Sequence, residues 1–128
     1  MHGAAMPCPC GTGIGYAACC KPYHEATATA SRVEALMRSR YSAYVLGLKN
    51  YLLATWHPGT RPQASDDLGL SESKRWLGLE VRRAFQTGTE GQVEFVARYK
   101  PASAPAGRLH ETSRFVLENG QWFYVEGV

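Results

Sequence analysis

The chain of 128 residues has the length of one domain, or of one domain with a small appendage, which excludes a large multidomain assembly. Its hydrophobic (45%) and charged (20%) fractions exclude a disordered tail and a coiled coil, and its net charge of +3 is too small to indicate strong binding to nucleic acid or a membrane surface. No apolar run approaches the roughly 20 residues of a membrane-spanning helix, and the first fifteen residues lack a signal-peptide pattern. We therefore expect a soluble cytoplasmic protein with no membrane span.

All four cysteines fall within the first twenty residues, as a Cys-x-Cys pair followed after eight residues by an adjacent pair: Cys8, Cys10, Cys19 and Cys20. Four thiolates complete a tetrahedral zinc shell with bonds of about 2.3 Å. The glycines at 11, 13 and 15 allow the tight or left-handed backbone that a short loop around one ion requires. The spacing predicts one zinc ion, and four protein ligands close its shell, so this zinc would be structural and not catalytic.

Three alternatives remain open for these cysteines from the residues alone. One of Cys8 and Cys10 could form a disulfide with one of Cys19 and Cys20, although disulfides are rare in a reducing cytoplasm. The thiols could be redox-active, because zinc thiolates release their metal when oxidised. His24 could replace one cysteine as a ligand. Four thiolates with one Zn²⁺ would lower the net charge of +3 by two, to +1.

The clearest helix follows a connector over residues 21–30. Ser31 as N-cap and Glu34 three residues later form a capping-box pattern. Apolar side chains then recur at steps of three and four, at Val33, Leu36, Met37, Tyr41, Tyr44, Val45 and Leu48. Gly47 weakens this helix near its end.

A second short helix is expected after Asn50 as its cap, and it stops before His57-Pro58-Gly59. One more helical turn is expected from Ser71 or Ser73 through Trp76. The period then changes from helical to alternating, which predicts four strands near 77–87, 92–100, 108–118 and 121–127. Helices followed by an antiparallel meander indicate an α+β fold.

The turn at Asn119-Gly120 predicts the register of the last hairpin, with Glu118 opposite Gln121 and Phe115 opposite Tyr124 on the core face. If the preceding hairpin is centred on Ala104, Phe95 lies opposite Ser113, and Ala97 lies opposite Glu111.

For the first strand to place Leu77, Leu79 and Val81 on the core face, the first hairpin loop must hold an odd number of residues.

Three polar residues are expected on this otherwise apolar face: Glu111, Ser113 and Glu126. Glu111 is the best candidate for a carboxylate with a raised pKa inside a pocket, and hence for a catalytic base. An acid–base site needs a second group within hydrogen-bond reach, for which Tyr41, Tyr44 and His57 are available. A purely structural role for Glu111 at the sheet margin stays open.

The N-terminal run CPCGTGIGYAACC resembles the SEC-C motif, the zinc-binding segment also found at the C-terminus of the SecA translocase, where the last ligand is commonly histidine and is here Cys20. The resemblance extends along the chain to the YchJ-like family of small bacterial proteins, through EALMRSRYSAYVLG at 34–47, YLLATWHPGTR at 51–61, VEFVARYK at 93–100 and RLHETSRFVLENGQWFYVEG at 108–127. It implies a zinc knuckle over residues 1–24 and, over 25–128, a domain similar to the nuclear transport factor two (NTF2) or cystatin-like fold, in which helices pack on a curved four-stranded antiparallel sheet.

The family implies no established reaction, so two functions are carried forward. The first is a non-catalytic protein-interaction module in which Thr12, Ile14, Lys21 and Tyr23 contact a protein partner. By analogy with the SecA segment, that partner would be a chaperone, a translocation component or a ribosomal component. The second is an isomerase or hydrolase that uses Glu111 in a pocket of the α+β domain.

The Arg38-Ser39-Arg40 run suggests RNA or phosphate binding, because arginine side chains suit phosphate oxygens. The near-neutral total charge disfavours that function, and we expect no nucleic-acid partner.

Overall fold

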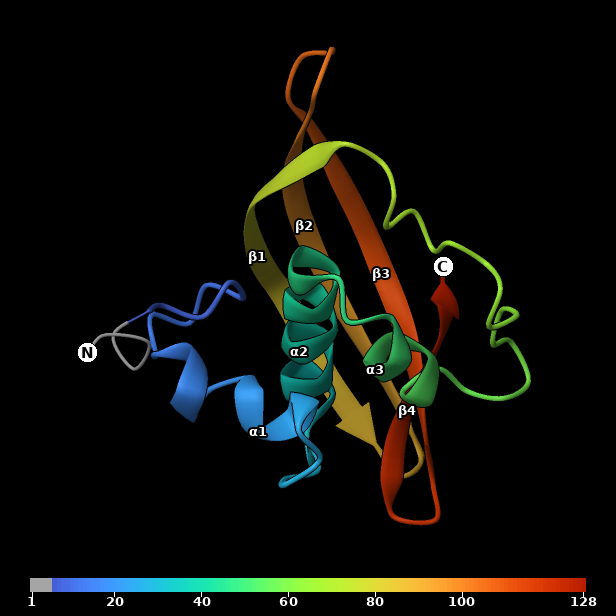
Figure 1. Cartoon of the computed structure of the whole chain (residues 1–128). Coiled ribbons are helices and arrows are strands. Elements are labelled where there is room, and N and C mark those ends of the chain that lie inside the picture. Colours follow the sequence, from blue (N-terminus) through green and yellow to red (C-terminus); the bar gives the residue numbers. More distant parts are fainter. Residues whose placement is uncertain (1–5) are drawn as a thin grey trace.

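A computed structural model describes residues 6–128 of the chain. In chain order, its elements are the 3-10 helix η2 (Tyr16–Ala18), the helices α1 (Lys21–His24), α2 (Val33–Leu46) and α3 (Lys49–Ala54), and the strands β1 (Lys74–Thr87), β2 (Glu90–Pro101), β3 (Gly107–Glu118) and β4 (Gln121–Gly127). The strands form one antiparallel sheet in the order β1-β2-β3-β4. Helix α2 lies across one face of this twisted sheet, and the N-terminal segment packs beside α2 (Figure 1). The α+β fold predicted from the sequence is confirmed.

Helix α2 begins with a contact from the sheet and not with a local cap. The expectation of Ser31 as N-cap is wrong, because the N-cap position is Arg32 and its side chain makes no capping hydrogen bond. Instead, the Val33 N–H donates to Oε1 of Gln86 in β1 (2.9 Å), and Nε2 of Gln86 donates to the Ser31 carbonyl (3.3 Å). The helix ends at Leu46, and Gly47 after it adopts a left-handed φ of 73°. Leu48, which the apolar stripe placed in this helix, therefore lies outside it.

Two other expected helix starts are also wrong. Helix α3 begins at Lys49, with Leu48 as N-cap, so Asn50 lies inside the helix. No helical turn starts at Ser71 or Ser73, because the backbone forms turns there and enters β1 at Lys74. The alternating pattern of that strand therefore extends further towards the N-terminus than predicted.

The last hairpin has the register that the sequence predicted at its turn, with Glu118 paired to Gln121 and Phe115 to Tyr124. Asn119 and Gly120 both have positive φ, of 53° and 77°, as a two-residue turn that matches the strand twist requires.

A bulge then interrupts this pairing after Phe115. Arg114 pairs with Glu126, so one residue of β4 is skipped. The expectation of Glu126 on the core face is wrong for this reason, because an extra residue inverts the alternation of side chains. Glu126 is exposed and accepts a hydrogen bond from Arg114 at 3.0 Å.

The middle hairpin is shifted from the predicted register. Phe95 pairs with Glu111 and Ala97 with Leu109, so the predicted partners Ser113 and Glu111 are each wrong by two residues. A shift of two is one full period of a strand, so every side chain keeps its face. Glu111 consequently stays on the side of the sheet that carries Phe95.

The first hairpin loop holds two residues, because Thr87 pairs with Glu90, and the expectation of an odd number is wrong. A bulge between Val81 and Arg83 supplies the missing odd residue and turns Val81 towards the core.

A second bulge, between Trp76 and Gly78, skips Leu77, which is 47% exposed in contrast to the expectation of a core position. Trp76 packs against the core instead.

The free edge of β4 is covered by the segment after α3. The Tyr124 N–H donates to the Thr55 carbonyl (2.9 Å), and the His57 N–H donates to the Tyr124 carbonyl (2.8 Å). This pairing leaves less of the edge exposed as a template for strand addition. Between residues 6 and 128, no helix has the length and hydrophobicity needed to cross a lipid bilayer.

The start of α2 yields a test of which residue caps it. We expect Gln86→Ala to lower the free energy of unfolding by about 1 kcal/mol, because it removes the acceptor of the Val33 N–H. Ser31→Ala, which would be the damaging change if Ser31 were the cap, is the matched control and should cost less than about 0.5 kcal/mol. Urea unfolding of both variants measures the difference, and a larger loss in Ser31→Ala would contradict the assignment.

Candidate functional site: a four-cysteine cluster and a cavity

The four cysteines come together where the N-terminal segment folds back on itself. The Cys8 N–H donates to the Ile14 carbonyl (2.9 Å), which closes the loop between the two cysteine pairs. Gly11 has a φ of 88°, and a Cβ there would lie 3.4 Å from the Leu79 carbonyl oxygen of β1, so glycine suits both the loop and its contact with the sheet.

The four Sγ atoms all lie within 4.8 Å of one another. The Sγ atoms of Cys10 and Cys19 are 3.6 Å apart, close to the edge of about 3.8 Å of a tetrahedron with zinc–sulfur bonds of about 2.3 Å. All four cysteines are free thiols, and three are buried while Cys19 is partly exposed. This donor set fits a single soft metal ion in a closed shell.

Hydroxyl groups surround the sulfurs. Ser42 of α2 is fully buried, and its Oγ lies 3.4 Å from the Sγ atoms of both Cys8 and Cys20. Thr12 Oγ1 lies 3.2 Å from the Cys19 Sγ and accepts a hydrogen bond from the Ile14 N–H. A hydroxyl that donates its hydrogen to a sulfur stabilises the thiolate, so the contacts of Thr12 with Cys19 and of Ser42 with Cys20 oppose the effect of burial on the pKa of these thiols.

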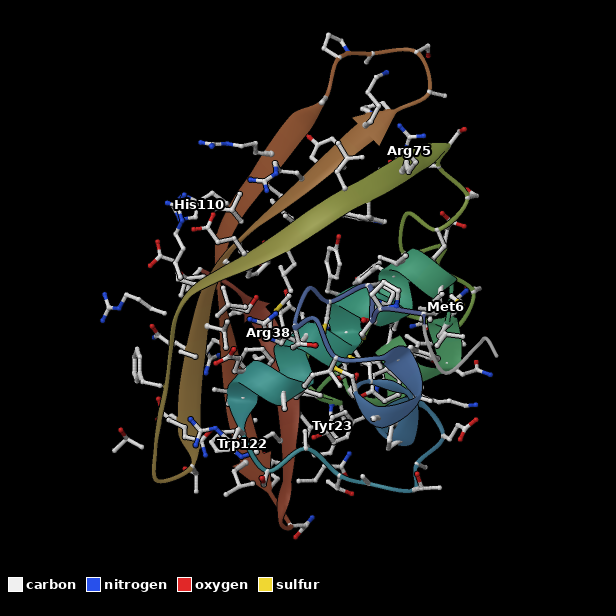
Figure 2. All side chains as sticks on the ribbon, turned by 90° about the vertical axis from the view of Figure 1, so that its left-hand side faces the viewer. Met6, Tyr23, Arg38, Arg75, His110 and Trp122 are labelled. Atoms are coloured by element: carbon white, nitrogen blue, oxygen red, sulfur yellow. The ribbon has the colours of Figure 1, made fainter. Side chains whose placement is uncertain are left out.

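Arg38 fixes the cluster to α2 through the backbone. Its Nη1 donates to the Cys10 carbonyl at 2.7 Å, and its Nε donates to Glu34 at 3.0 Å. Figure 2 shows Arg38 on the side of α2 against which the N-terminal segment packs. Arg38 therefore connects the cysteine loop to α2.

His24 lies next to the cluster but is not one of its donors. Its Nε2 lies 2.8 Å from the Ser39 carbonyl, so Nε2 carries the hydrogen, and in the neutral ring Nδ1 then accepts from the Tyr16 hydroxyl at 2.7 Å. Both ring nitrogens thus join the knuckle to α2. Among residues 6–128, the group of potential ligands consists of the four cysteines without His24.

The thiols share charge unequally. A hydrogen bond with Cys20 lowers the pKa of Cys10 to about 4. The same bond, with burial, raises the pKa of Cys20, and burial raises the pKa of Cys19. Negative charge therefore gathers on Cys10, and a divalent cation would take the place of the remaining thiol protons.

The residues predicted to contact a partner differ in their exposure. Thr12, Ile14 and Lys21 are exposed, Ile14 at 50%, whereas Tyr23 is half-buried. Thr12 is already engaged with Cys19, which leaves Ile14 and Lys21 as the freer side chains of the knuckle.

A cavity of about 470 Å³ lies between the C-terminal half of α2, the sheet and the loop over residues 68–72. Its lining is rich in aromatic and apolar side chains, with a few polar groups: Arg40, Tyr41, Tyr44, Trp76, Glu111 and Tyr124. Leu46 and Leu109 also line it and are exposed at 43% and 41%, so the cavity reaches the surface. Its volume and mixed lining are typical of small-molecule sites.

The structure brings Glu111 into this cavity, as the sequence analysis expected. The Ser113 hydroxyl donates to its Oε2 at 3.0 Å. Tyr41 and Tyr44 line the same cavity, whereas His57 bonds Glu118 at 2.8 Å and does not line it. A Cβ at Gly127 would lie 2.5 Å from the Glu111 carboxyl carbon, so glycine there leaves room for this side chain.

Arg40 is the cavity residue that sequence reasoning missed, because it was grouped with Arg38 as a surface cation. Its side chain is 3% exposed, and Nη1 donates to the Leu52 carbonyl (2.8 Å) and to Thr55 Oγ1 (2.7 Å). The guanidinium also lies over the rings of Trp56 and Tyr124. The sequence position of Arg40 could have indicated its burial, because it follows the buried residues Leu36 and Met37 by four and three residues and so lies on the same side of the helix.

The helices pack over an antiparallel meander, which is the arrangement of an NTF2-like domain. This domain is joined to a four-cysteine segment of the kind that binds metal. Residues 32–127 match the family model "YchJ, middle NTF2-like domain", so the chain belongs to this family, and the resemblance seen in the sequence is confirmed. A UPF0225 protein from Chromobacterium violaceum is 52% identical over 132 residues, which cover 98% of this chain and 94% of that relative.

Two solved structures share the whole arrangement. The solution structure of a SEC-C motif containing protein from Rhodopseudomonas palustris has a TM-score of 0.88 at 37% identity and covers 96% of this chain and 98% of that chain. The crystal structure of a SEC-C motif containing protein from Psychrobacter arcticus has a TM-score of 0.79 at 29% identity, with 98% and 84% covered. The likeness therefore includes the cysteine segment as well as the NTF2-like domain.

The cavity tyrosines predict the response of stability to alkali. Burial and the nearby charge of Glu111 raise the pKa of Tyr124 to about 12, against about 10 in an unfolded chain. Between these values the unfolded state releases its proton first, so stability falls as the pH rises from 10 to 12. We expect Tyr124→Phe to show a shallower fall than the wild type in urea unfolding across this range. Equal slopes would contradict the assigned shift.

Proposed function

We propose that the four cysteines bind one zinc ion as a closed structural site, and that the chain acts as a non-catalytic protein-interaction module. The proximity of four Sγ atoms within 4.8 Å carries the metal part of the proposal. The SEC-C motif named for the two solved relatives supports zinc as the metal. Four free thiols also suit a reducing compartment, so the proposal includes the cytoplasm as the place of action.

Zinc would supply the stability that the N-terminal segment does not obtain from its own structure. Its helices, η2 with three residues and α1 with four, are too short to persist alone. Structural zinc in small peptides contributes about 10–16 kcal/mol to folding at neutral pH. The ion would hold residues 6–24 as a unit against the domain over 25–128. The sequence predicts a knuckle over 1–24, and its first five residues lie outside the described part of the chain.

The knuckle offers a small apolar surface for a protein partner. Met6 and Ile14 are exposed at 57% and 50% beside the metal loop, and Lys21 is exposed nearby in the sequence. The Tyr16 N–H donates to the Met6 carbonyl at 2.9 Å, so this surface depends on the fold of the loop. A chaperone, translocation component or ribosomal protein with an apolar pocket fits it, by analogy with the SecA segment.

The second function is an isomerase or hydrolase with Glu111 as base. A cavity is present for it, but in the described chain few groups that could assist Glu111 in catalysis lie close to its carboxylate. Within residues 6–128, the hydrogen-bond partner of the Glu111 carboxylate is Ser113, and neither Tyr41 nor Tyr44 bonds to it. A general base requires a second group that transfers the proton onwards or stabilises the developing charge. The cavity therefore favours binding over catalysis.

The metal assignment predicts one zinc per chain in protein purified without added metal. The double variant Cys8→Ser, Cys10→Ser should contain none, because it loses two of four thiolates. Ser42→Ala is the matched control: it keeps every ligand, should keep one equivalent, and should lose zinc to a chelator about 10–100-fold more readily because a hydroxyl donor is gone. Elemental analysis for zinc and iron makes the measurement, and a metal-free wild type or an iron-loaded one would contradict the proposal.

The interaction surface predicts site-specific crosslinking in living cells. A photo-crosslinking amino acid at position 14 should capture a discrete protein band, and the same probe at Phe85, 48% exposed on β1, is the matched control that should not. The band at position 14 should disappear in the Cys8→Ser, Cys10→Ser background, because the metal that would hold the loop presenting Ile14 loses two of its four thiolates. Equal capture from positions 14 and 85 would count against a specific surface.

A further inference from the structure

Arg40 carries a buried positive charge with no counter-ion in the described chain. Its side chain is 3% exposed, and no carboxylate of residues 6–128 lies within 4.0 Å of it. Burial lowers its pKa to about 10, so the group stays protonated at neutral pH. Buried charges in proteins are normally paired with an opposite charge, so an anion bound at Arg40 would add to the hydrogen bonds and ring contacts that already hold its guanidinium.

The neighbours of Arg40 satisfy one end of the guanidinium. Nη1 donates to both Leu52 and Thr55. Nε and Nη2 donate to no acceptor among residues 6–128. Arg40 lines the cavity of about 470 Å³, so these two N–H groups are the ones left for a ligand.

The same cavity contains further donors without internal partners. The hydroxyls of Tyr44 and Tyr124 make no hydrogen bond within the described residues, and burial raises the pKa of both, so they stay protonated and able to donate. The ring of Trp76, 5.7 Å from that of Tyr41 between centroids, supplies a flat apolar wall. A cavity with a positive charge and hydrogen-bond donors at one place, and an aromatic wall beside them, suits a ligand with an anionic head and an apolar body.

We propose that this cavity binds a small organic monocarboxylate, with its carboxylate on the Nε and Nη2 edge of Arg40 and its apolar body against Tyr41 and Trp76. This edge presents two parallel N–H donors, the geometry that a carboxylate accepts with both oxygens. The proposal adds a ligand site to the zinc and interaction functions and does not depend on either of them.

Glu111 narrows the class of ligand. It lines the same cavity from β3, and its charge acts on Tyr44 and Tyr124, the two residues that Arg40 also influences. A second carboxylate on the ligand would meet this negative charge in a partly desolvated space. The cavity thus favours one negative charge per ligand, and a hydroxyl or amino group on the distal end would find an acceptor in Glu111.

The test uses ¹⁹F NMR of the whole zinc-loaded chain with 4-fluorophenylacetate and its neutral analogue 4-fluorophenylacetamide. We expect the acid to bind at least tenfold more tightly than the amide. Arg40→Gln should weaken binding of the acid at least tenfold, whereas Arg114→Gln, which changes an arginine on the outer face of the sheet, is the matched control and should leave it unchanged.

Tyr124→Phe keeps the ring and loses one donor, so it should weaken binding of the acid about threefold to tenfold. If Arg40→Gln does not fold, Tyr124→Phe and the comparison of the acid with the amide test the proposal without it. Equal binding of acid and amide, absence of binding of either, or full retention of acid binding in folded Arg40→Gln would each overturn the proposal.

Discussion

Helix α2 has to bury more than one side, and this constraint organises the rest of the molecule. Its apolar side packs on the sheet through residues such as Leu36 and Met37. A second side, with Arg38 and Ser42, carries the cysteine cluster. Arg40, on the same side as Leu36 and Met37, reaches α3 and the cavity. A helix enclosed on several sides needs a partner for each polar group it buries, because an unsatisfied group costs about 1–3 kcal/mol. Knuckle, α3 and cavity all lie where α2 offers such groups.

The sequence predicted the elements better than the contacts between them. Alternation located four strands, and the Asn119-Gly120 turn fixed the last register, because both signals are local. The bulges at Arg82 and after Phe115 left no local signal, yet each inverts the side chains beyond it. The cap of α2 failed for a related reason: Gln86 lies 53 residues from Val33, and a pattern that examines neighbouring residues cannot anticipate a donor–acceptor pair formed by the fold.

The same distinction separates the two sites. Soft ligands at short spacing within one loop indicated the cysteine cluster from the sequence alone. Glu111 could be assigned to the core face, because strand periodicity survives a register error of two residues. Helical spacing could indicate that Arg40 is buried, but not what it contacts. Two hydrogen bonds of about 1.5–3 kcal/mol each and contacts with two rings offset a desolvation cost of several kcal/mol. All of these partners come from α3, β4 and their connections.

The basic Arg-Ser-Arg run shows how a charge pattern changes meaning once the chain folds. Four thiolates around the proposed divalent ion would leave two negative charges in a mostly buried cluster, and such a charge would need donors close by. Arg38, whose Nη1 bonds the Cys10 carbonyl, brings a positive charge to this point, and Ser42 brings a hydroxyl. Part of the basic excess of the sequence therefore serves the interior of the molecule.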